Sequence, residues 1–370
     1  MKSGNIHIQQ LFHLMILFQL GSIGINLGNH IGKDMWISFL LGMMEGAILF
    51  IIYYSLHRQY PNYTYAQILQ ELLGRFLGTC LIFLYSGYFI YIGSRVVRDI
   101  AEILTFHTLY ETPTWFISIV LLLATSYAGY KGIDTTARAA GILLKLFLFL
   151  WITFLIFIFL SGLFHLQYLQ PILQHGWQPL IQNILPLTIP YGGMITFLML
   201  FPYIRQKDQI FKRGLYGILI SGTILTITMV LNIGILGEIV TLELDFPLLT
   251  SSGLIRVGTF IQRLEPVAII LLIIGVFFKV FIFHYTSSLS LAFALNKKNS
   301  ICMLLVTSII MACLSIFGAA NNISHLYIGL EILPYYFHIP FQIIIPIGLL
   351  LLSLVHTDDS GTKKGSIANK

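Results

Sequence analysis

Long apolar runs occupy almost the whole chain and are separated by short segments rich in glycine, proline and charge. The runs are continuous rather than alternating, and each is long enough to cross a hydrocarbon layer of about 30 Å as a helix. Because only helices and closed barrels satisfy their backbone in lipid, the pattern predicts an all-α integral membrane protein. We place ten spans at about 8–30, 35–56, 77–106, 114–130, 135–163, 185–204, 213–237, 264–293, 300–318 and 336–355.

The ten spans form two groups of five, which predicts a single permease-like domain over 1–370 with halves at 1–165 and 180–356. Residues 357–370 are polar and are expected to form a flexible cytoplasmic tail. A capping-box pattern at Thr64 and Gln67, followed by apolar residues on one helical face, predicts a short helix on the membrane surface before the third span.

Basic residues between the spans set the orientation, because lysine and arginine are retained on the cytoplasmic side. In the ten-span topology most of them fall on one side, from Lys2 near the N-terminus to Lys370 at the C-terminus. The opposite loops contribute little beyond Lys33 and Arg256. We therefore expect both termini to be cytoplasmic and the number of spans to be even.

Two spans are interrupted at residues that are poor helix formers. The first span contains Gly21-Ser22-Ile23-Gly24, and the sixth contains Pro190-Tyr191-Gly192-Gly193. Proline removes a backbone hydrogen bond and glycine weakens a helix, and unwound backbone at membrane depth is tolerated only where it is buried or lines a cavity. A broken first helix in each half is typical of inverted-repeat transporters with a binding site at the midplane.

The breaks suggest a ligand with two charges. Free N–H groups near Ile23 to Ile25 would receive a carboxylate, and free carbonyls near Pro190 to Gly192 would receive an ammonium group. A zwitterionic amino acid fits both. The alternative interpretation is that the glycines are small residues that let helices pack closely.

The third span carries a charged helical face made of Arg95, Arg98, Asp99 and Glu102. Their spacing permits the pairs Arg95–Asp99 and Arg98–Glu102, on a face that should turn toward the bundle interior. One interpretation is a gate or ligand path, and the other is a structural ladder of ion pairs near the outer end.

Isolated ionisable residues lie inside three other spans, at Glu45, Lys145 and Lys279. An unpaired charge there would cost several kcal/mol, so each needs a partner or neutralisation. A lysine in this setting would occupy the space of a coupling sodium ion and exchange a proton, or it would pair permanently with Glu45. Thr286 and Ser287 in the eighth span offer hydroxyls to an ion or substrate, or simply hydrogen-bond to helix carbonyls.

Composition excludes several other functions. The chain is 57% hydrophobic and 10% charged, and its net charge of +6 is explained by cytoplasmic loops beside anionic lipid, so we do not predict nucleic-acid binding. The sequence contains no phosphate-binding loop, no zinc-spaced histidine or cysteine cluster and no nucleophile elbow, so we predict neither enzymatic activity nor a metal or cofactor. The three cysteines are interpreted as packing residues.

Short motifs in a fixed order carry a resemblance that runs through nearly the whole chain. They are Gly32-Lys33-Asp34-Met35-Trp36-Ile37-Ser38, Tyr60-Pro61, Leu73-Gly74-Arg75-Phe76-Leu77-Gly78, Thr112-Pro113, Phe246-Pro247 and Gln262-Arg263-Leu264-Glu265. With these motifs the chain resembles the B subunits of GerA-type spore germinant receptors, a branch of the amino acid–polyamine–organocation permease superfamily with the LeuT-like fold. Members of the family more often have glutamate where this chain has Gln262.

The resemblance implies a nutrient sensor in the inner membrane of a bacterial endospore, acting with an A subunit and a lipoprotein C subunit. Binding of a germinant, commonly an amino acid, would signal release of ions and dipicolinate. Two other interpretations remain: a secondary transporter that moves an amino acid with a proton or sodium ion, and an interaction scaffold whose pocket is empty. A pocket filled by bulky side chains would favour the scaffold.

The expected ligand pocket combines the two breaks with residues of the third and eighth spans. Its members are Gly21, Ser22, Gly24, Tyr91, Arg95, Pro190, Tyr191, Gly192 and Thr286. Arg263 and Glu265 are expected to form either a structural pair at the extracellular rim or a conformational switch.

Overall fold

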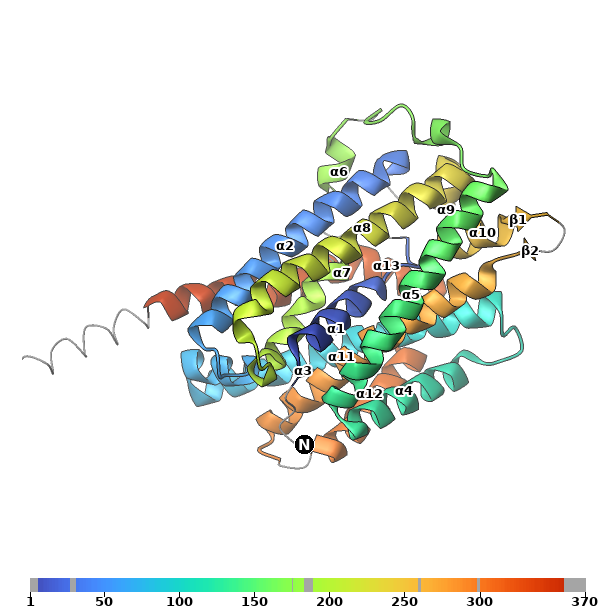
Figure 1. Ribbon diagram of the computed structural model, residues 1–370. Coiled ribbons are helices and arrows are strands. Elements are labelled where there is room, and N and C mark those ends of the chain that lie inside the picture. The colour runs from blue at the N-terminus through green and yellow to red at the C-terminus, as the bar shows by residue number, and fades with distance from the viewer. Residues whose placement is uncertain are drawn as a thin grey trace, which may run out of the picture.

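The computed structural model (Figure 1) describes residues 6–26, 31–174, 176–182, 189–258, 261–297 and 300–355. It confirms an all-α protein. Within these ranges the only sheet is a small antiparallel hairpin in which β1 (Arg256–Val257) pairs with β2 (Ile261–Gln262). The expected tail at 357–370 lies outside the described residues.

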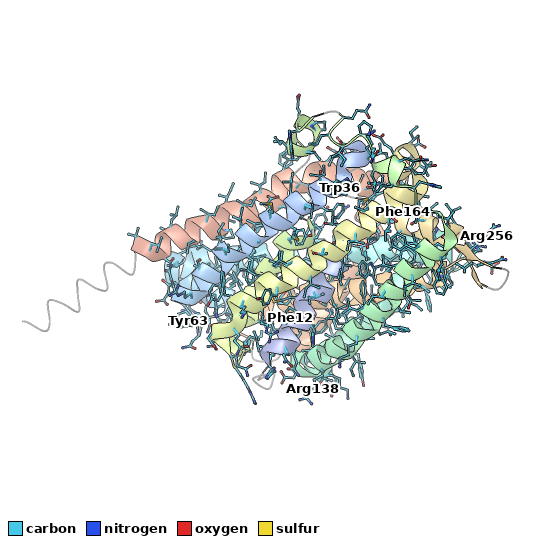
Figure 2. All side chains as sticks on the ribbon, turned by 45° about the horizontal axis from the view of Figure 1, so that its top comes forward. Phe12, Trp36, Tyr63, Arg138, Phe164 and Arg256 are labelled. Atoms are coloured by element: carbon cyan, nitrogen blue, oxygen red, sulfur yellow. The ribbon has the colours of Figure 1, made fainter. Side chains whose placement is uncertain are left out.

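Six helices among the described residues are long and apolar enough to cross a membrane. They are α2 (Met35–Gln59), α3 (Tyr65–His107), α5 (Ile133–Ser161), α8 (Ile210–Leu236), α11 (Glu265–Ala294) and the C-terminal segment Pro334–Val355. The number rises to seven if Ile301–Phe317 and Asn322–Ile332, which meet at a bend of 117°, form one broken span. The chain is therefore an integral membrane protein. Figure 2 places Tyr63, Phe12 and Arg138 toward one end of the bundle and Trp36 and Arg256 toward the other.

Both predicted interruptions coincide with the end of an α-helix. Helix α1 (Ile8–Leu20) has 13 residues and is about 20 Å long, too short to cross the bilayer alone. It ends at Gly21, and the following residues to Asn26 form turns. In the second half, α7 (Ile189–Gly192) passes at Gly193 into the 3₁₀ helix η4 (Gly193–Met199), which is followed by η5 (Phe201–Tyr203).

The predicted surface helix forms the first part of α3. Thr64 and Gln67 make the expected reciprocal capping box, with the Gln67 side chain accepting from the Thr64 N–H at 2.8 Å. At Gly74 the backbone takes φ 76°, a conformation that glycine adopts without strain, and the chain turns there into the membrane-length part of the helix.

The end of the chain differs from the expectation of a loop between residues 318 and 336. After α12 (Ser300–Phe317), helix resumes at α13 (Asn322–Tyr327) and continues through two π-helical segments, η7 (Ile328–Ile332) and η8 (Pro334–Ile344). Asn321 caps this helix by accepting from the Ser324 N–H at 2.8 Å. Pro334 and Pro340 supply no N–H to the helix, which is a recognised cause of wide turns. The sequence pattern therefore missed only the part of this helix before residue 336.

Packing places α1 at the centre of the bundle, against α5, α8 and α11 (Figure 1). Around it α3 packs along α11, α2 along α8, and α4 (Thr114–Lys131) along α12. Short elements cap the end that holds the hairpin and are η1 (Gly32–Asp34), η2 (Leu166–Leu169), α6 (Gln178–Gln182), α9 (Glu238–Glu243) and α10 (Pro247–Leu254). The short helix η6 (Lys207–Gln209) leads into α8 at the opposite end. Near the centre of this arrangement, the two interrupted segments, α3 and α11 converge on the cavity described next.

Candidate binding site

A cavity with about 630 Å³ of unfilled space, part of it open to solvent, lies where the two interrupted segments meet α3, α11 and the C-terminal helix. The C-terminal helix is the helical run from Asn322 to Val355, which contains α13, η7 and η8. Ile25 comes from the first interruption and Gly193 from the second. Its lining is otherwise made of Ile92, Arg95, Val96, Asp99, Lys279, Phe283, Leu326, Gly329, Leu330, Leu333, His338 and Gln342. The walls are therefore largely apolar, with a small number of charged and polar groups, as is usual for a small-molecule site.

Lys279 connects α11 to the first interruption. Its side chain is 3% exposed, and its Nζ donates a hydrogen bond to the Ser22 hydroxyl. The ammonium also lies 5.8 Å from the ring centroid of Phe18 on α1. A side-chain Cβ at Gly21 would come within 2.8 Å of Lys279 Cβ, so glycine is what allows the lysine to approach the end of α1.

Two of the backbone N–H groups that were expected to be free, those of Ile23 and Ile25, donate hydrogen bonds within the chain. Ser22 and Ile23 donate to Gln19 and Leu20 at 3.1 and 3.0 Å, and Ile25 donates to Ser22 at 3.3 Å. The chain turns here instead of starting a new helix within residues 21–26, and residues 27–30 lie outside the described ranges. The Lys279 ammonium, which donates to the Ser22 hydroxyl, is the charged group at this position.

The second interruption is held by side chains from α2 and the C-terminal helix. The Tyr53 hydroxyl donates to the Gly192 carbonyl at 3.3 Å and to the Gln342 carbonyl at 2.7 Å. A Cβ at Gly192 would overlap the Gln342 side-chain amide. Gln342 donates to the Tyr88 hydroxyl at 2.6 Å, and that hydroxyl lies 2.7 Å from His338 Nδ1.

The charged face of α3 contacts the bent C-terminal segment, which is the chain around the bend between α12 and α13. Arg98 and Glu102 form the predicted ion pair at 2.7 Å, and Arg98 also donates to the Ala319 carbonyl at 2.8 Å. The predicted Arg95–Asp99 pair is wrong for the described residues. Asp99 instead pairs with His325 at 2.7 Å, and Arg95 donates to the His325 carbonyl. The helix at Asn322, which the sequence interpretation placed in a loop, supplies this unexpected partner.

Several predicted pocket residues lie beside the cavity without lining it. Gly24 lies against Leu272 of α11, so a side chain there would meet that leucine. Pro190 and Tyr191 are buried in α7, and the Tyr191 hydroxyl has no hydrogen-bond partner among the described residues. The Tyr91 ring lies 5.9 Å from that of Phe337. Thr286 is fully buried and donates to the Ile282 carbonyl at 2.7 Å.

The other predicted coupling and switch residues are separated from the cavity. Ser287 donates to the His284 carbonyl at 2.8 Å, so it follows the alternative of bonding to its own helix. Glu45 is half-buried on α2, and no ion pair joins it to Lys145 or Lys279 in the described part of the chain. Lys145 is exposed on α5. The Arg263–Glu265 pair forms at 2.9 Å, with the arginine side chain 68% exposed.

Sequence reasoning missed the residues that the C-terminal helix brings to the site. These are His325, Gly329, His338 and Gln342. The available signal was the i, i+4 spacing of His338 and Gln342, two polar residues within an apolar run, which puts both on one helical face. Together with Tyr88 and Tyr53 they make a buried hydrogen-bonded network beside the second interruption.

The cavity combines two cations and one anion in a largely apolar space. Lys279 and Arg95 offer donors suited to a carboxylate or to polar oxygens, and Asp99 offers an acceptor. No three histidine, cysteine, aspartate or glutamate side chains come together as a metal site in the described ranges. The arrangement is suited to binding a small polar molecule.

Comparison with known proteins identifies the family. The model of the spore permease family, described as spore germination protein, matches residues 5–323. The chain is 34% identical to spore germination protein KB of Bacillus subtilis (strain 168), covering 100% of both chains. It is 26% identical to spore germination protein A2 of the same organism over 74% of this chain and 75% of the relative. Spore germination protein XB of Bacillus anthracis is 24% identical over 86% of this chain and 92% of its own length. The chain therefore belongs to the spore permease family of spore germination proteins.

Proposed function

We propose that this chain is the B subunit of a nutrient germinant receptor and that it triggers spore germination when a small nutrient binds in the cavity. The similarity to spore germination protein KB over the full length of both chains supports the receptor role. The observation that carries the binding role is the position of the cavity. It is bounded by both interrupted segments, so a bound molecule would contact both places where a helix of the bundle is broken.

The nutrient we propose is an amino acid. Its carboxylate would interact with Lys279 and Arg95, and its ammonium group with Asp99, all three of which line the cavity. This assignment differs from the sequence expectation, in which backbone N–H groups received the carboxylate.

The fold we propose is a ten-helix inverted repeat of the LeuT-like type. We count α1 as the first span and α7 with η4 as the sixth. Each of the first four spans then packs against the span that comes five places later in the chain. The pairs are α1 with α7, α2 with α8, α3 with α11, and α4 with α12. A pseudo-two-fold relation between halves would produce this pairing.

The receptor would lie in the inner membrane of the spore with both termini facing the core. It would act beside an A subunit and a lipoprotein C subunit, which would respond because the nutrient prefers one conformation of the B subunit. The contacts of α3 with the bent C-terminal segment provide a connection between the cavity and the membrane surface.

A proton- or sodium-coupled amino-acid transporter is the second candidate, and the Lys279 position favours it. A buried ammonium that donates to Ser22 beside the first interruption occupies a place where a coupling cation would serve equally well. Gain and loss of a proton at such a lysine would provide coupling without a bound metal ion.

Germination of dormant spores tests the receptor role. A strain lacking the gene would be challenged with single amino acids, sugars and mixtures, and then complemented with wild type, Val96→Phe or Leu84→Phe. Val96 lines the cavity, whereas Leu84 lies on the same helix and is 56% exposed. We expect wild type and Leu84→Phe to restore the response to one nutrient class and Val96→Phe to fail. Unchanged germination in the deletion strain, with impaired amino-acid uptake in growing cells, would favour the transporter.

A further inference from the structure

Three basic side chains from different helices gather at the end of the bundle where α1 and α8 begin. They are His13 on α1, Lys145 on α5 and Arg213 in the first turn of α8. Lys145 and Arg213 both lie within electrostatic range of the His13 ring. Lys145 follows Gly141 by one turn of α5, and its long side chain carries the ammonium group on a flexible stem.

The local packing explains why these groups come together. The position of Gly141 leaves room for His13, since a Cβ there would be 3.0 Å from the imidazole Nδ1. The Arg213 guanidinium lies over the Phe12 ring at 5.6 Å, which holds it on the α1 side of α8. Arg138 is one turn from Gly141 on the same side of α5, and Figure 2 places it at the same end of the bundle as Phe12.

The cluster forms no ion pair with a carboxylate in the described part of the chain. Within the described residues no salt bridge joins Arg138, Lys145 or Arg213 to a carboxylate. Asp134, one turn before Arg138, instead interacts electrostatically with Tyr285 of α11. Neighbouring cations repel one another, so an external anion would stabilise this end of the bundle.

The surface beside the cluster is apolar. Ile142, Phe149, Ile152 and Ile156 continue the α5 face that carries Lys145, and each is at least 50% exposed. A face of this kind on a membrane-length helix contacts acyl chains. Positive charge at the membrane surface therefore adjoins a strip suited to hydrocarbon.

We propose that Lys145, Arg213 and His13 bind the phosphate of an anionic phospholipid whose acyl chain lies along the exposed face of α5. Basic pockets between helices near the membrane surface are suited to such headgroups. The phosphate would bridge α5 and α8, both of which pack against the central helix α1. The lipid would thereby hold the helices that surround the first interruption, independently of any nutrient.

Native mass spectrometry of the purified full chain tests this site. The protein would be mixed with dioleoyl phosphatidylglycerol, dioleoyl phosphatidylcholine or inorganic phosphate, and the retained adducts would be counted. We expect retention of phosphatidylglycerol only. Each basic residue near a membrane surface is worth about 1 kcal/mol, so Lys145→Gln with Arg213→Gln should weaken phosphatidylglycerol binding about thirtyfold.

Two control variants keep the result interpretable. Arg75→Gln with Lys297→Gln removes the same charge from other exposed positions and should leave retention unchanged. Lys145→Arg should also retain the lipid, since it keeps the charge. Equal retention of phosphatidylcholine, equal loss in the control pair, or competition by inorganic phosphate with no lipid preference would overturn the proposal. If Lys145→Gln with Arg213→Gln fails to fold, Lys145→Gln is measured alone. Loss of phosphatidylglycerol at an unchanged melting temperature would then support the site, and full retention would overturn it.

Discussion

The carboxylate Oδ1 of Asp99 lies 2.7 Å from Nε2 of His325, and this contact joins α3 to α13 in the bent C-terminal segment. The same turn accepts a hydrogen bond from Arg95 through the His325 carbonyl. Gly329 and Leu330, which follow within a turn and a half, line the cavity. The pair therefore fixes the position of one cavity wall relative to α3.

Disruption of this pair should lower the free energy of unfolding, and the losses from the two single substitutions should not add in the double variant. Asp99→Asn and His325→Gln each leave a mostly buried polar partner with a weaker hydrogen bond, because the pair is only 13% and 2% exposed. In a double-mutant cycle monitored by thermal unfolding in detergent, we expect a coupling energy of about 1 kcal/mol. Strict additivity of the two single variants would contradict a direct interaction.

The contact between Gly192 and Gln342 predicts a compensating pair of substitutions. Gly192→Ala would push a methyl group into the Gln342 amide and should destabilise the protein by about 1–3 kcal/mol. Shortening the neighbour in Gly192→Ala/Gln342→Ala should recover part of the melting temperature. The matched control is Gly87→Ala on α3, where a Cβ meets no atom within 4 Å and little change is expected. A loss that Gln342→Ala does not relieve would rule out the steric explanation.

Asn26 ties the first interruption to α9 and to the residue that follows it. Its Nδ2 donates to the Thr241 carbonyl at 2.7 Å and to the Leu244 carbonyl at 3.0 Å. Asn26→Ala removes both bonds in a buried setting and should lower the free energy of unfolding by about 2 kcal/mol. Asn26→Asp should be worse, since a carboxylate would face two carbonyl oxygens. A melting temperature unchanged in both variants would contradict this account.

Asp245, in the segment between α9 and α10, gives a pH-dependent prediction. Burial raises the pKa of this carboxyl above its ordinary value of 3.8. The folded state therefore favours the protonated form, so stability from this group is complete below pH 3.8 and is lost as the pH rises through the folded-state pKa. Asp245→Asn should raise the melting temperature more at pH 7 than at pH 4. The opposite order would show that ionised Asp245 is stabilised by the fold.

Apolar periodicity was enough to predict the helical class and most membrane-length helices. The six long helices occupy runs that the pattern identifies, because each must present apolar residues to lipid along its whole length. Both interruptions were also predictable, since Gly21 and Gly192 lie within runs that would otherwise be continuous helix. The ten-helix repeat remains a proposal, supported by the pairing of the helices.

The composition of the cavity was only partly predictable. Arg95, Asp99 and Lys279 were identified because a charge inside an apolar helix demands an explanation. The partner of Arg95 and Asp99 was not, since His325 belongs to the helix from Asn322, a stretch that the sequence pattern left between two spans. For Thr286 the sequence left two alternatives open, and the structure shows the bond to the carbonyl one turn earlier.

The most direct test of the proposed nutrient site is ligand-dependent thermal stability of the purified chain in nanodiscs, measured against single amino acids and hexoses. A ligand that binds only the folded protein stabilises it by about 2.7 kcal/mol at a hundred times its dissociation constant. The account predicts that one compound raises the melting temperature of wild type and of Leu84→Phe in a saturable manner but leaves Val96→Phe unchanged. An equal rise in Val96→Phe would place the nutrient outside the cavity and contradict the account.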